Sequence, residues 1–394
     1  MSRIRKIAAH YTLCPHSGLI PRAVLSFDED GRLIALENDV SKLDSLYGIE
    51  FFSGILVPGF VNAHCHLELS YLKGMIPPGT GLEGFVHRIA QVRHDATEAE
   101  RVRAADVQDS LMRREGVVAV GDICNDAFAF PLKQRSKIHY QNFIEIFGSD
   151  PSVAERALRR GREVAGEAER AGQPYALTPH ATYSVSEGLF SGIVGANPAW
   201  KPLSVHFMES EAERLLFRGE GAFAERYRAE GVAVDFTRYA SPADRLVSSV
   251  PAETPLLLIH NTFVSEEDID RINGHFKEVT WVVCPRSNDY IEGSFPPIDL
   301  LRRKGCRIAV GTDSLSSNTS LSPVEELKLL AARKPELPLA ELIEWQTWNG
   351  AEALGITSWA GSFEAGKSPG AVLIDRIDWD KMALTSESTA RRIV

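Results

Sequence analysis

Cysteine is scarce in this chain, which has five among its 394 residues, at positions 14, 65, 124, 284 and 306. They are scattered, odd in number and contain no Cys-x-x-Cys pair, which excludes a regular disulfide framework and a thiolate zinc site. The combined signature His-x-Glu with Pro-Cys-x-x-Cys is also missing, which excludes the cytidine-deaminase type of zinc enzyme. We therefore expect a protein of a reducing compartment.

Long apolar runs are missing as well. No stretch approaches the roughly 20 consecutive apolar residues of a membrane-spanning helix. The N-terminal MSRIRKIAAHYTL has basic residues but no apolar run long enough for the core of a signal peptide. The formal net charge of -10 argues against nucleic acid and anionic membranes as partners. The expectation is a cytoplasmic protein that acts on a small molecule.

Strand-like patterns are present at both ends of the chain. Residues 24–37 alternate apolar and polar side chains around an acidic turn that ends in Gly31, as in a β-hairpin. Near the other end, GSFEAGKSPGAVLI (361–374) alternates in the same way. Because chain termini often lie close together, we expect both ends to build one small β domain, from residues 1–57 and 359–394.

The middle of the chain alternates short apolar runs with longer charged, alanine-rich stretches. The stretches 96–115 and 152–171 are typical of amphipathic helices. Eight buried strands that alternate with helices predict an α/β fold, a (β/α)8 barrel over residues 58–358. A doubly wound parallel sheet is the alternative. The predicted strands are 55–64, 117–124, 138–147, 175–183, 203–207, 255–260, 279–284 and 307–313.

Polar side chains stand at the carboxyl-terminal ends of these strands, where barrels of this type place their active sites. His64 and His66 end the first strand two residues apart, so both rings can face the same side. The fifth strand supplies His206 and Glu209, the sixth ends at His260, and the eighth runs into Asp313. Each of these residues alone could be an ordinary structural residue, but no structural requirement explains why all of them stand at the ends of strands. Three neutral imidazoles and a carboxylate suit zinc, with ferrous iron possible.

Six segments of the chain, taken in order, resemble the amidohydrolase superfamily and in particular its deaminase and chlorohydrolase branch. The resemblance implies one divalent metal ion held by His64, His66, His206 and Asp313, and no carboxylated lysine. It also identifies 361–374 as part of a terminal β-sandwich. The segments are VPGFVNAHCHLELS (57–70), PHATYSVS (179–186), HFMESEAE (206–213), IHNTFVS (259–265), CPRSN (284–288) and GTDS (311–314).

The same resemblance implies roles for the remaining polar residues. Glu209 moves a proton to the attacked ring nitrogen and later to the leaving group, and Asp313 accepts a proton in addition to holding the metal. His260 orients the attacking water and helps to deprotonate it, or stabilises the developing charge. His180 and Asn288 belong to the substrate pocket. Glu83 is expected to bind ribose hydroxyls, and Arg88 or Arg93 to bind a substrate carboxylate. The alternative is that Glu83, Arg88 and Arg93 are solvated helix charges.

Three functions follow from these residues. The first is hydrolytic deamination of an adenine-type nucleoside, the second is hydrolysis of another C–N or C–Cl bond, as in guanine deaminases and triazine chlorohydrolases, and the third is a non-catalytic scaffold. HCHLELSYLKG (64–74) and the lid-like residues 76–93 are most similar to the subgroup that deaminates aminodeoxyfutalosine in menaquinone biosynthesis. The subgroups that act on adenosine, methylthioadenosine and adenosylhomocysteine are nearly as similar to this sequence. A homo-oligomer is left open.

Overall fold

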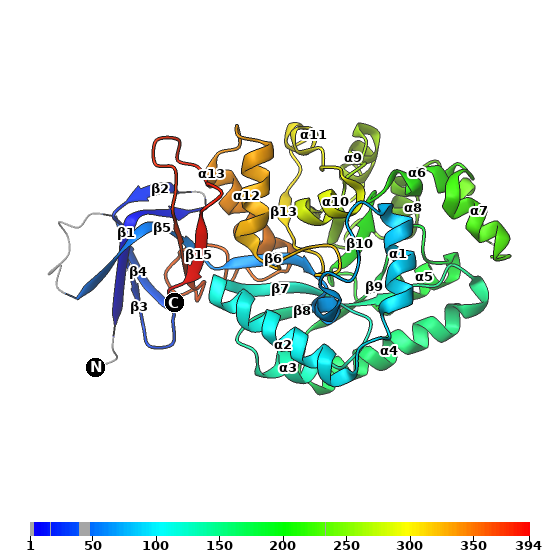
Figure 1. Ribbon diagram of the computed structural model, residues 1–394, viewed down its shortest axis with the longest axis horizontal. Coiled ribbons are helices and arrows are strands. Elements are labelled where there is room, and N and C mark those ends of the chain that lie inside the picture. The colour runs from blue at the N-terminus through cyan, green and yellow to red at the C-terminus, as the bar shows by residue number, and fades with distance from the viewer. Residues whose placement is uncertain (1–3, 16, 39–47, 233) are drawn as a thin grey trace.

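A computed structural model describes residues 4–15, 17–38, 48–232 and 234–394. Positions 1–3, 16 and 39–47 of the predicted terminal domain lie outside the described residues. β1, near the start of the chain, and β15, near its end, belong to one sheet that projects from the larger α/β part (Figure 1). None of the helices within the described ranges is long and apolar enough to cross a membrane.

The projecting sheet has seven strands, in the order β15-β14-β5-β1-β3-β4 with β2 on β1. The predicted hairpin is present, because β3 and β4 pair antiparallel around Gly31, which has a φ of 79°. Within the described residues the pairing defines one sheet, where the sequence predicted a sandwich. The strands are β1 Arg5–Cys14, β2 Gly18–Pro21, β3 Val24–Phe27, β4 Leu33–Glu37, β5 Ile49–Pro58, β14 Ala371–Asp375 and β15 Thr389–Arg392.

The larger part contains two four-stranded parallel sheets, β6-β7-β8-β9 and β10-β11-β12-β13. Single parallel bridges join their edges, Ala181 to His206 on one side and Cys65 to Asp313 on the other. The strands are buried on both faces, as their near-continuous apolar sequences require. They are β6 Phe60–Cys65, β7 Val117–Cys124, β8 His139–Ile146, β9 Tyr175–Pro179, β10 Leu203–Phe207, β11 Leu256–His260, β12 Val279–Val283 and β13 Ile308–Val310.

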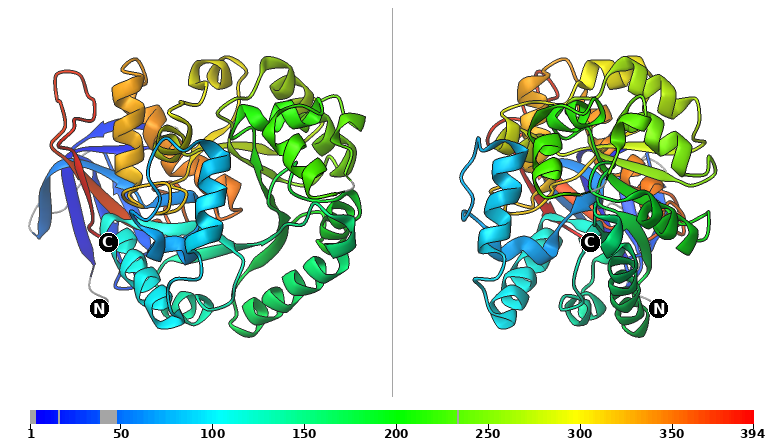
Figure 2. Two further views of the ribbon diagram at one scale, coloured as in Figure 1. Left: turned by 45° about the vertical axis from the view of Figure 1, so that its right-hand side comes forward. Right: turned by 90° about the vertical axis from the view of Figure 1, so that its right-hand side faces the viewer.

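Helices surround these strands on the outside (Figure 2). The two predicted helical stretches are α2 and α4, and Thr97 and Glu100 form a capping box at the start of α2. The helices are α1 Gly81–Val92, α2 Glu98–Glu115, α3 Phe130–Arg135, α4 Ala154–Arg170, α5 Glu187–Ala196, α6 Glu211–Phe217, α7 Gly221–Ala229, α8 Pro242–Ser249, α9 Glu266–Asn273, α10 Pro285–Glu292, α11 Ile298–Arg303, α12 Pro323–Arg333, α13 Leu339–Gln346 and α14 Trp348–Ala353.

One strand prediction was wrong, because residues 55–64 form parts of two strands. β5 belongs to the terminal sheet, where it pairs with β1 and β14, and β6 pairs with β7. Pro58 has no amide hydrogen to continue a ladder. At Gly59 the backbone amide donates to the Pro369 carbonyl at 2.9 Å, and an added Cβ would lie 2.3 Å from a methyl group of Val118. The chain therefore changes sheets at this position.

The stretch GTGLEG at 79–84 has the Gly-x-Gly-x-x-Gly spacing of dinucleotide-binding turns. In those turns the glycines lie between a strand and a helix. Here they follow a 3-10 helix, Leu67–Leu72, and lead into α1. This context, together with the two bridged sheets, argues against the doubly wound alternative.

Candidate active site

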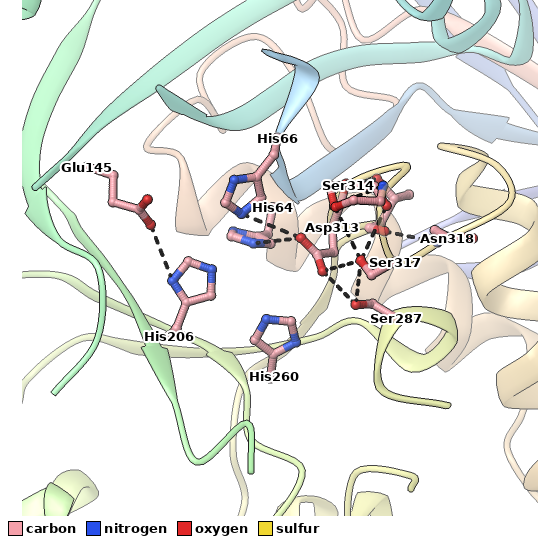
Figure 3. A network of polar contacts seen from close by, with 12 residues as sticks. His64, His66, Glu145, His206, His260, Ser287, Asp313, Ser314, Ser317 and Asn318 are labelled. Atoms are coloured by element: carbon pink, nitrogen blue, oxygen red, sulfur yellow. Dashed lines mark hydrogen bonds and ion pairs between the residues drawn. The ribbon is translucent and has the colours of Figure 1, made fainter. Parts of the chain in front are cut away.

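Four histidines converge at the carboxyl-terminal ends of the parallel strands (Figure 3). His64 and His66 come from the end of β6, and alternation along the strand directs both to the same side while Cys65 packs into the core. His206 lies in β10, and its ring centre is 5.0 Å from that of His64 and 5.5 Å from that of His66. His260 ends β11, with its ring centre 5.4 Å from that of His206.

Asp313 reaches the same place from the loop after β13. Its Oδ1 lies 3.7 Å from Nε2 of His64 and 3.5 Å from Nε2 of His66. Its Oδ2 accepts hydrogen bonds from the hydroxyls of Ser287 at 2.5 Å and Ser317 at 2.6 Å. The two serines fix the carboxylate, so that one oxygen is turned toward the histidines.

These residues fit a divalent cation. Both ring nitrogens of His64 and Nδ1 of His66 are buried and have no hydrogen-bond partner within the described part of the chain, which in a folded protein needs an explanation such as a bound ion. Burial lowers the pKa of His66 to about 4, so its imidazole is neutral, as a metal ligand must be. Ligand atoms of His64, His66 and Asp313 all lie within 4.8 Å of one another. This nitrogen and oxygen set suits zinc or ferrous iron.

The outer contacts of two histidines determine which nitrogen each presents. The Nδ1 hydrogen of His206 is donated to the carbonyl of His180 at 2.8 Å, which leaves Nε2 for the centre of the site. His260 likewise uses Nδ1 toward Oδ1 of Asn288, at 2.8 Å. Glu145, His180 and His206 also bring ligand atoms within 4.8 Å of one another. Because Nδ1 of His206 is already used, that group is a poor second metal site.

Glu209 lies beside His260, with Oε1 of the carboxyl 3.5 Å from Nε2 of the ring. The side chain is 8% exposed yet reaches the cavity. Burial raises the pKa of Glu209 to about 7, and the neighbouring His260 opposes that rise. A carboxyl group with such a pKa can both donate and accept a proton near neutral pH.

A cavity of about 710 Å³ opens above these residues and has the size of a small-molecule site. Apolar and aromatic side chains form much of its wall, among them Leu82 and Phe85 of α1 and Tyr183. Its polar lining includes the arginines Arg93, Arg101, Arg160 and Arg226. A ligand that combines an aromatic ring with polar groups matches this lining.

The structure brings most of the predicted residues together. His64, which lies beneath the cavity, joins His66, His180, His206, Glu209, His260 and Asp313, which all line it. Asn288 instead lies buried behind His260. Glu83 and Arg88 are exposed on α1 and are not in the cavity wall, and Arg88 bonds to Gln91 at 3.0 Å. Arg93, the second arginine proposed for a carboxylate, does line the cavity.

Sequence reasoning missed three polar residues of the site. Glu145 is the penultimate residue of β8 and its Oε1 lies 3.5 Å from Nδ1 of His206, and the hydroxyls of Ser287 and Ser317 donate to Asp313. Glu145 carried a signal, because an acidic residue interrupts the apolar strand IHYQNFIEIF. Ser287 lies within the segment CPRSN, but Ser317 carried no signal, since it comes from a loop rich in ordinary polar residues.

The profile of the Amidohydrolase family matches residues 55–392. Since the match covers most of the chain, the chain belongs to the amidohydrolase family and is an enzyme of that family. The family match includes the strands that carry the histidines and Asp313.

Relatives within this family act on nucleosides, according to their names. The adenosine deaminase of Helicobacter pylori is 29% identical over 325 residues, 80% of this chain and 78% of the relative. The aminodeoxyfutalosine deaminase of a Nitratiruptor species is 27% identical over 388 residues, 94% of this chain and 91% of the relative.

Solved structures share the fold. Helicobacter pylori aminofutalosine deaminase in complex with methylthio-coformycin superposes with a TM-score of 0.83 and 24% identity, over 99% of this chain and 100% of that chain. An adenosine deaminase of Xanthomonas campestris with bound zinc has a TM-score of 0.74 and 22% identity, over 96% and 86% of the two chains.

Proposed function

We propose that this enzyme replaces the amino group of an adenine-type nucleoside with oxygen and releases ammonia. The observation that carries the proposal is Glu209, a buried carboxyl with a pKa near 7, beside His260 and the cation ligands at the base of a nucleoside-sized cavity. The relatives named as adenosine, aminodeoxyfutalosine and methylthioadenosine/adenosylhomocysteine deaminases support it. A non-catalytic scaffold is disfavoured, because it has no need for this proton-transfer pair.

The reaction needs proton transfers that these side chains can perform. Protonated Glu209 donates its proton to the ring nitrogen next to the amino-bearing carbon. The resulting carboxylate then takes the remaining proton of the added water and passes it to the departing amine, which leaves as ammonia. His260, held through Nδ1 by Asn288, directs Nε2 at the attacking water. Asp313 accepts the proton of that water through the oxygen that the serines leave open.

We propose one divalent cation per chain, zinc or ferrous iron, held by His64, His66, His206 and Asp313. When bound, such a cation lowers the pKa of a water molecule toward neutrality. Elemental analysis of purified protein is expected to find one metal equivalent, and Asp313→Ala is expected to lose most of it. Two equivalents, or full occupancy in Asp313→Ala, would contradict this ligand set.

Aminodeoxyfutalosine is the proposed preferred substrate, which places the enzyme in menaquinone biosynthesis. The arginines of the cavity support this choice over adenosine and methylthioadenosine, which have no carboxylate, because aminodeoxyfutalosine ends in an aromatic carboxylate. Adenosylhomocysteine also carries a carboxylate, but on an aliphatic tail, which suits the aromatic side chains of the cavity wall less well. Arg101 stacks on Phe128 with its guanidinium carbon 4.2 Å from the ring centre and donates through one terminal nitrogen to Asp126 at 3.3 Å, while its Nε has no hydrogen-bond partner among the described residues. Arg93 and Arg101 are therefore the proposed carboxylate-binding residues, in place of Arg88.

The test is ammonia release and the adenine-to-hypoxanthine absorbance change across these four nucleosides, guanine and a chlorotriazine. We expect the highest kcat/KM with aminodeoxyfutalosine. Arg93→Ala and Arg101→Ala should raise KM for that substrate and leave methylthioadenosine unaffected, with Arg88→Ala as the exposed control. Faster turnover of another nucleoside would overturn the substrate, and reaction with guanine or the triazine alone would overturn nucleoside deamination.

For the fold we propose that the two bridged sheets form one closed (β/α)8 barrel over residues 58–358. Residues 1–57 and 359–394 are proposed as the separate terminal domain. The single bridges at both seams support the closed barrel.

A further inference from the structure

Glu213 is a fully buried carboxyl that has no part in the mechanism above. It lies in α6, four residues after Glu209, with 0% of its surface exposed, and it does not line the cavity. A buried carboxyl group is costly unless hydrogen-bond donors surround it. The donors that surround Glu213 come from two turns that carry residues of the active site.

The first donor is the backbone amide of Met208, which lies 2.6 Å from Oε2 of Glu213. Met208 has a φ of +48°, a left-handed conformation that a residue with a side chain adopts only when its surroundings hold it. Its carbonyl accepts a hydrogen bond from Phe263 at 2.9 Å, so both sides of the residue are fixed. Because Glu209 is the next residue, the direction of its side chain depends on this conformation.

The second donor is the hydroxyl of Thr182, which bonds to Oε1 of Glu213. Thr182 belongs to the turn after β9 that also contains His180. The carbonyl of His180 accepts hydrogen bonds from both the amide and Nδ1 of His206, at 2.9 and 2.8 Å. The buried guanidinium of Arg245 holds the same turn through the carbonyls of Thr182 and Val185. One carboxyl group therefore joins the turn that orients His206 to the turn that carries Glu209.

We propose that Glu213 is a positioning residue that directs Glu209 at the substrate by joining the turns of Thr182 and Met208. The inference rests on the proposed deaminase function. A carboxyl group suits the role because it has two oxygens that can accept, and two donors converge on it from the turns after two different strands. A glutamine offers one accepting oxygen, and an alanine offers none.

The test is a double-mutant cycle between Glu213 and Glu209, measured with aminodeoxyfutalosine, or with adenosine if the wild-type enzyme turns it over faster. Glu213→Ala should lower kcat by about 10²-fold, as expected for a misplaced catalytic group, with KM and metal content unchanged. In a Glu209→Gln background the same change should cost less than about threefold, because the residue through which Glu213 acts is already disabled. Glu211→Ala, an exposed change in the same helix, is the matched control.

A similar loss of kcat in both backgrounds would overturn the proposal, because a merely structural residue acts independently of Glu209. So would a Glu213→Ala enzyme with wild-type kcat. If Glu213→Ala does not accumulate as folded protein, Glu213→Gln and Thr182→Val are tested in its place. Each should lower kcat by less than Glu213→Ala, and this loss must also vanish in the Glu209→Gln background. A wild-type enzyme that releases no ammonia from any nucleoside contradicts the proposed function itself, which separates that failure from this one.

Discussion

Left-handed backbone conformations gather at single residues around the candidate active site. Met208, His260, Asn261 and Asp313 have φ values of 48°, 77°, 56° and 55°, and none of them is glycine. Each such residue costs on the order of 1–3 kcal/mol and persists only where neighbouring contacts hold it. Here those contacts include Glu213 on Met208 and the serine hydroxyls on Asp313. The strain therefore lies where side chains must be aimed at one point.

Glu209→Gln is expected to keep its bound metal and lose activity. Glutamine has nearly the same shape but cannot transfer a proton, and proton transfer by a positioned side chain contributes about 10²–10⁴-fold to the rate. The measurement is kcat together with metal content. Glu211→Gln, exposed two residues away, is the control and should match the wild type. If Glu209→Gln retains most of the activity, another residue carries the proton.

Glu326 predicts a pH dependence of stability. Burial raises the pKa of this carboxyl to about 8 from an ordinary 4.5, although the amide of Arg286 and the side chain of Asn318 donate to it. Between these pH values the folded protein keeps a proton that the unfolded chain has released. The free energy of unfolding should therefore fall as pH rises through this window, by at most about 1.4 kcal/mol per pH unit from this group.

Urea denaturation of the metal-free protein at about pH 5.5 and pH 7.5 measures this dependence. Glu326→Gln cannot titrate and should show a smaller decrease between the two pH values. Glu325→Gln, at the more exposed neighbouring position of α12, should keep the wild-type decrease. An unchanged decrease in Glu326→Gln would assign the effect to other groups.

Among the elements, α1 links the cavity wall to the helix α10, which carries residues of the candidate active site. Leu82, in the first turn of α1, donates its amide to Oε1 of Glu292 at 2.8 Å, and Glu292 ends α10, which also carries Ser287 and Asn288. Gly79 donates to the carbonyl of Tyr290 in the same helix at 2.7 Å. The position of the apolar wall therefore depends on α10.

Glu292→Ala should raise KM about fivefold with kcat little changed, because a lost helix-terminal hydrogen bond costs about 1 kcal/mol. Amide hydrogen exchange in the first turn of α1 should become faster. Glu292→Gln keeps an accepting oxygen without the charge and should resemble the wild type. Equal effects of the two substitutions would point to the charge of Glu292 instead of its hydrogen bond.

The strands could be predicted from the sequence because buried parallel strands have near-continuous apolar runs. The exception was 55–64, where one apolar run continues across a change of sheet that local composition does not reveal. That strand-end residues such as His206 lie close together could be predicted, because their position in the fold is tied to a strand. The positions of Glu83 and Arg88 could not be predicted, since the rotation of α1 about its axis, which turns both to solvent, depends on packing against α10.

At the scale of the whole molecule, Gly59 is the point where the terminal sheet meets the larger part. A methyl group there would lie 2.3 Å from Val118 and 2.5 Å from the Pro369 carbonyl. Gly59→Ala should lower the free energy of unfolding by about 1–3 kcal/mol through overpacking. Urea denaturation measures it. Gly166→Ala, in α4 with open space around it, should leave stability equal or raise it by up to about 1 kcal/mol. Equal free energies of unfolding for Gly59→Ala and Gly166→Ala would contradict tight packing around Gly59.

The pairing of β5 with β14 also bears on synthesis by the ribosome. β5 ends at Pro58 and its neighbour β14 begins at Ala371, so roughly 310 residues separate the two partners. At a translation rate of about 5–20 residues per second, β14 is synthesised roughly 15–60 s after β5, and until then one edge of β5 has no partner strand. During that time the nascent chain presents an unpaired strand, the kind of edge that recruits other chains. A chaperone that covers β5 during translation should therefore raise the yield of soluble enzyme more than one supplied after release.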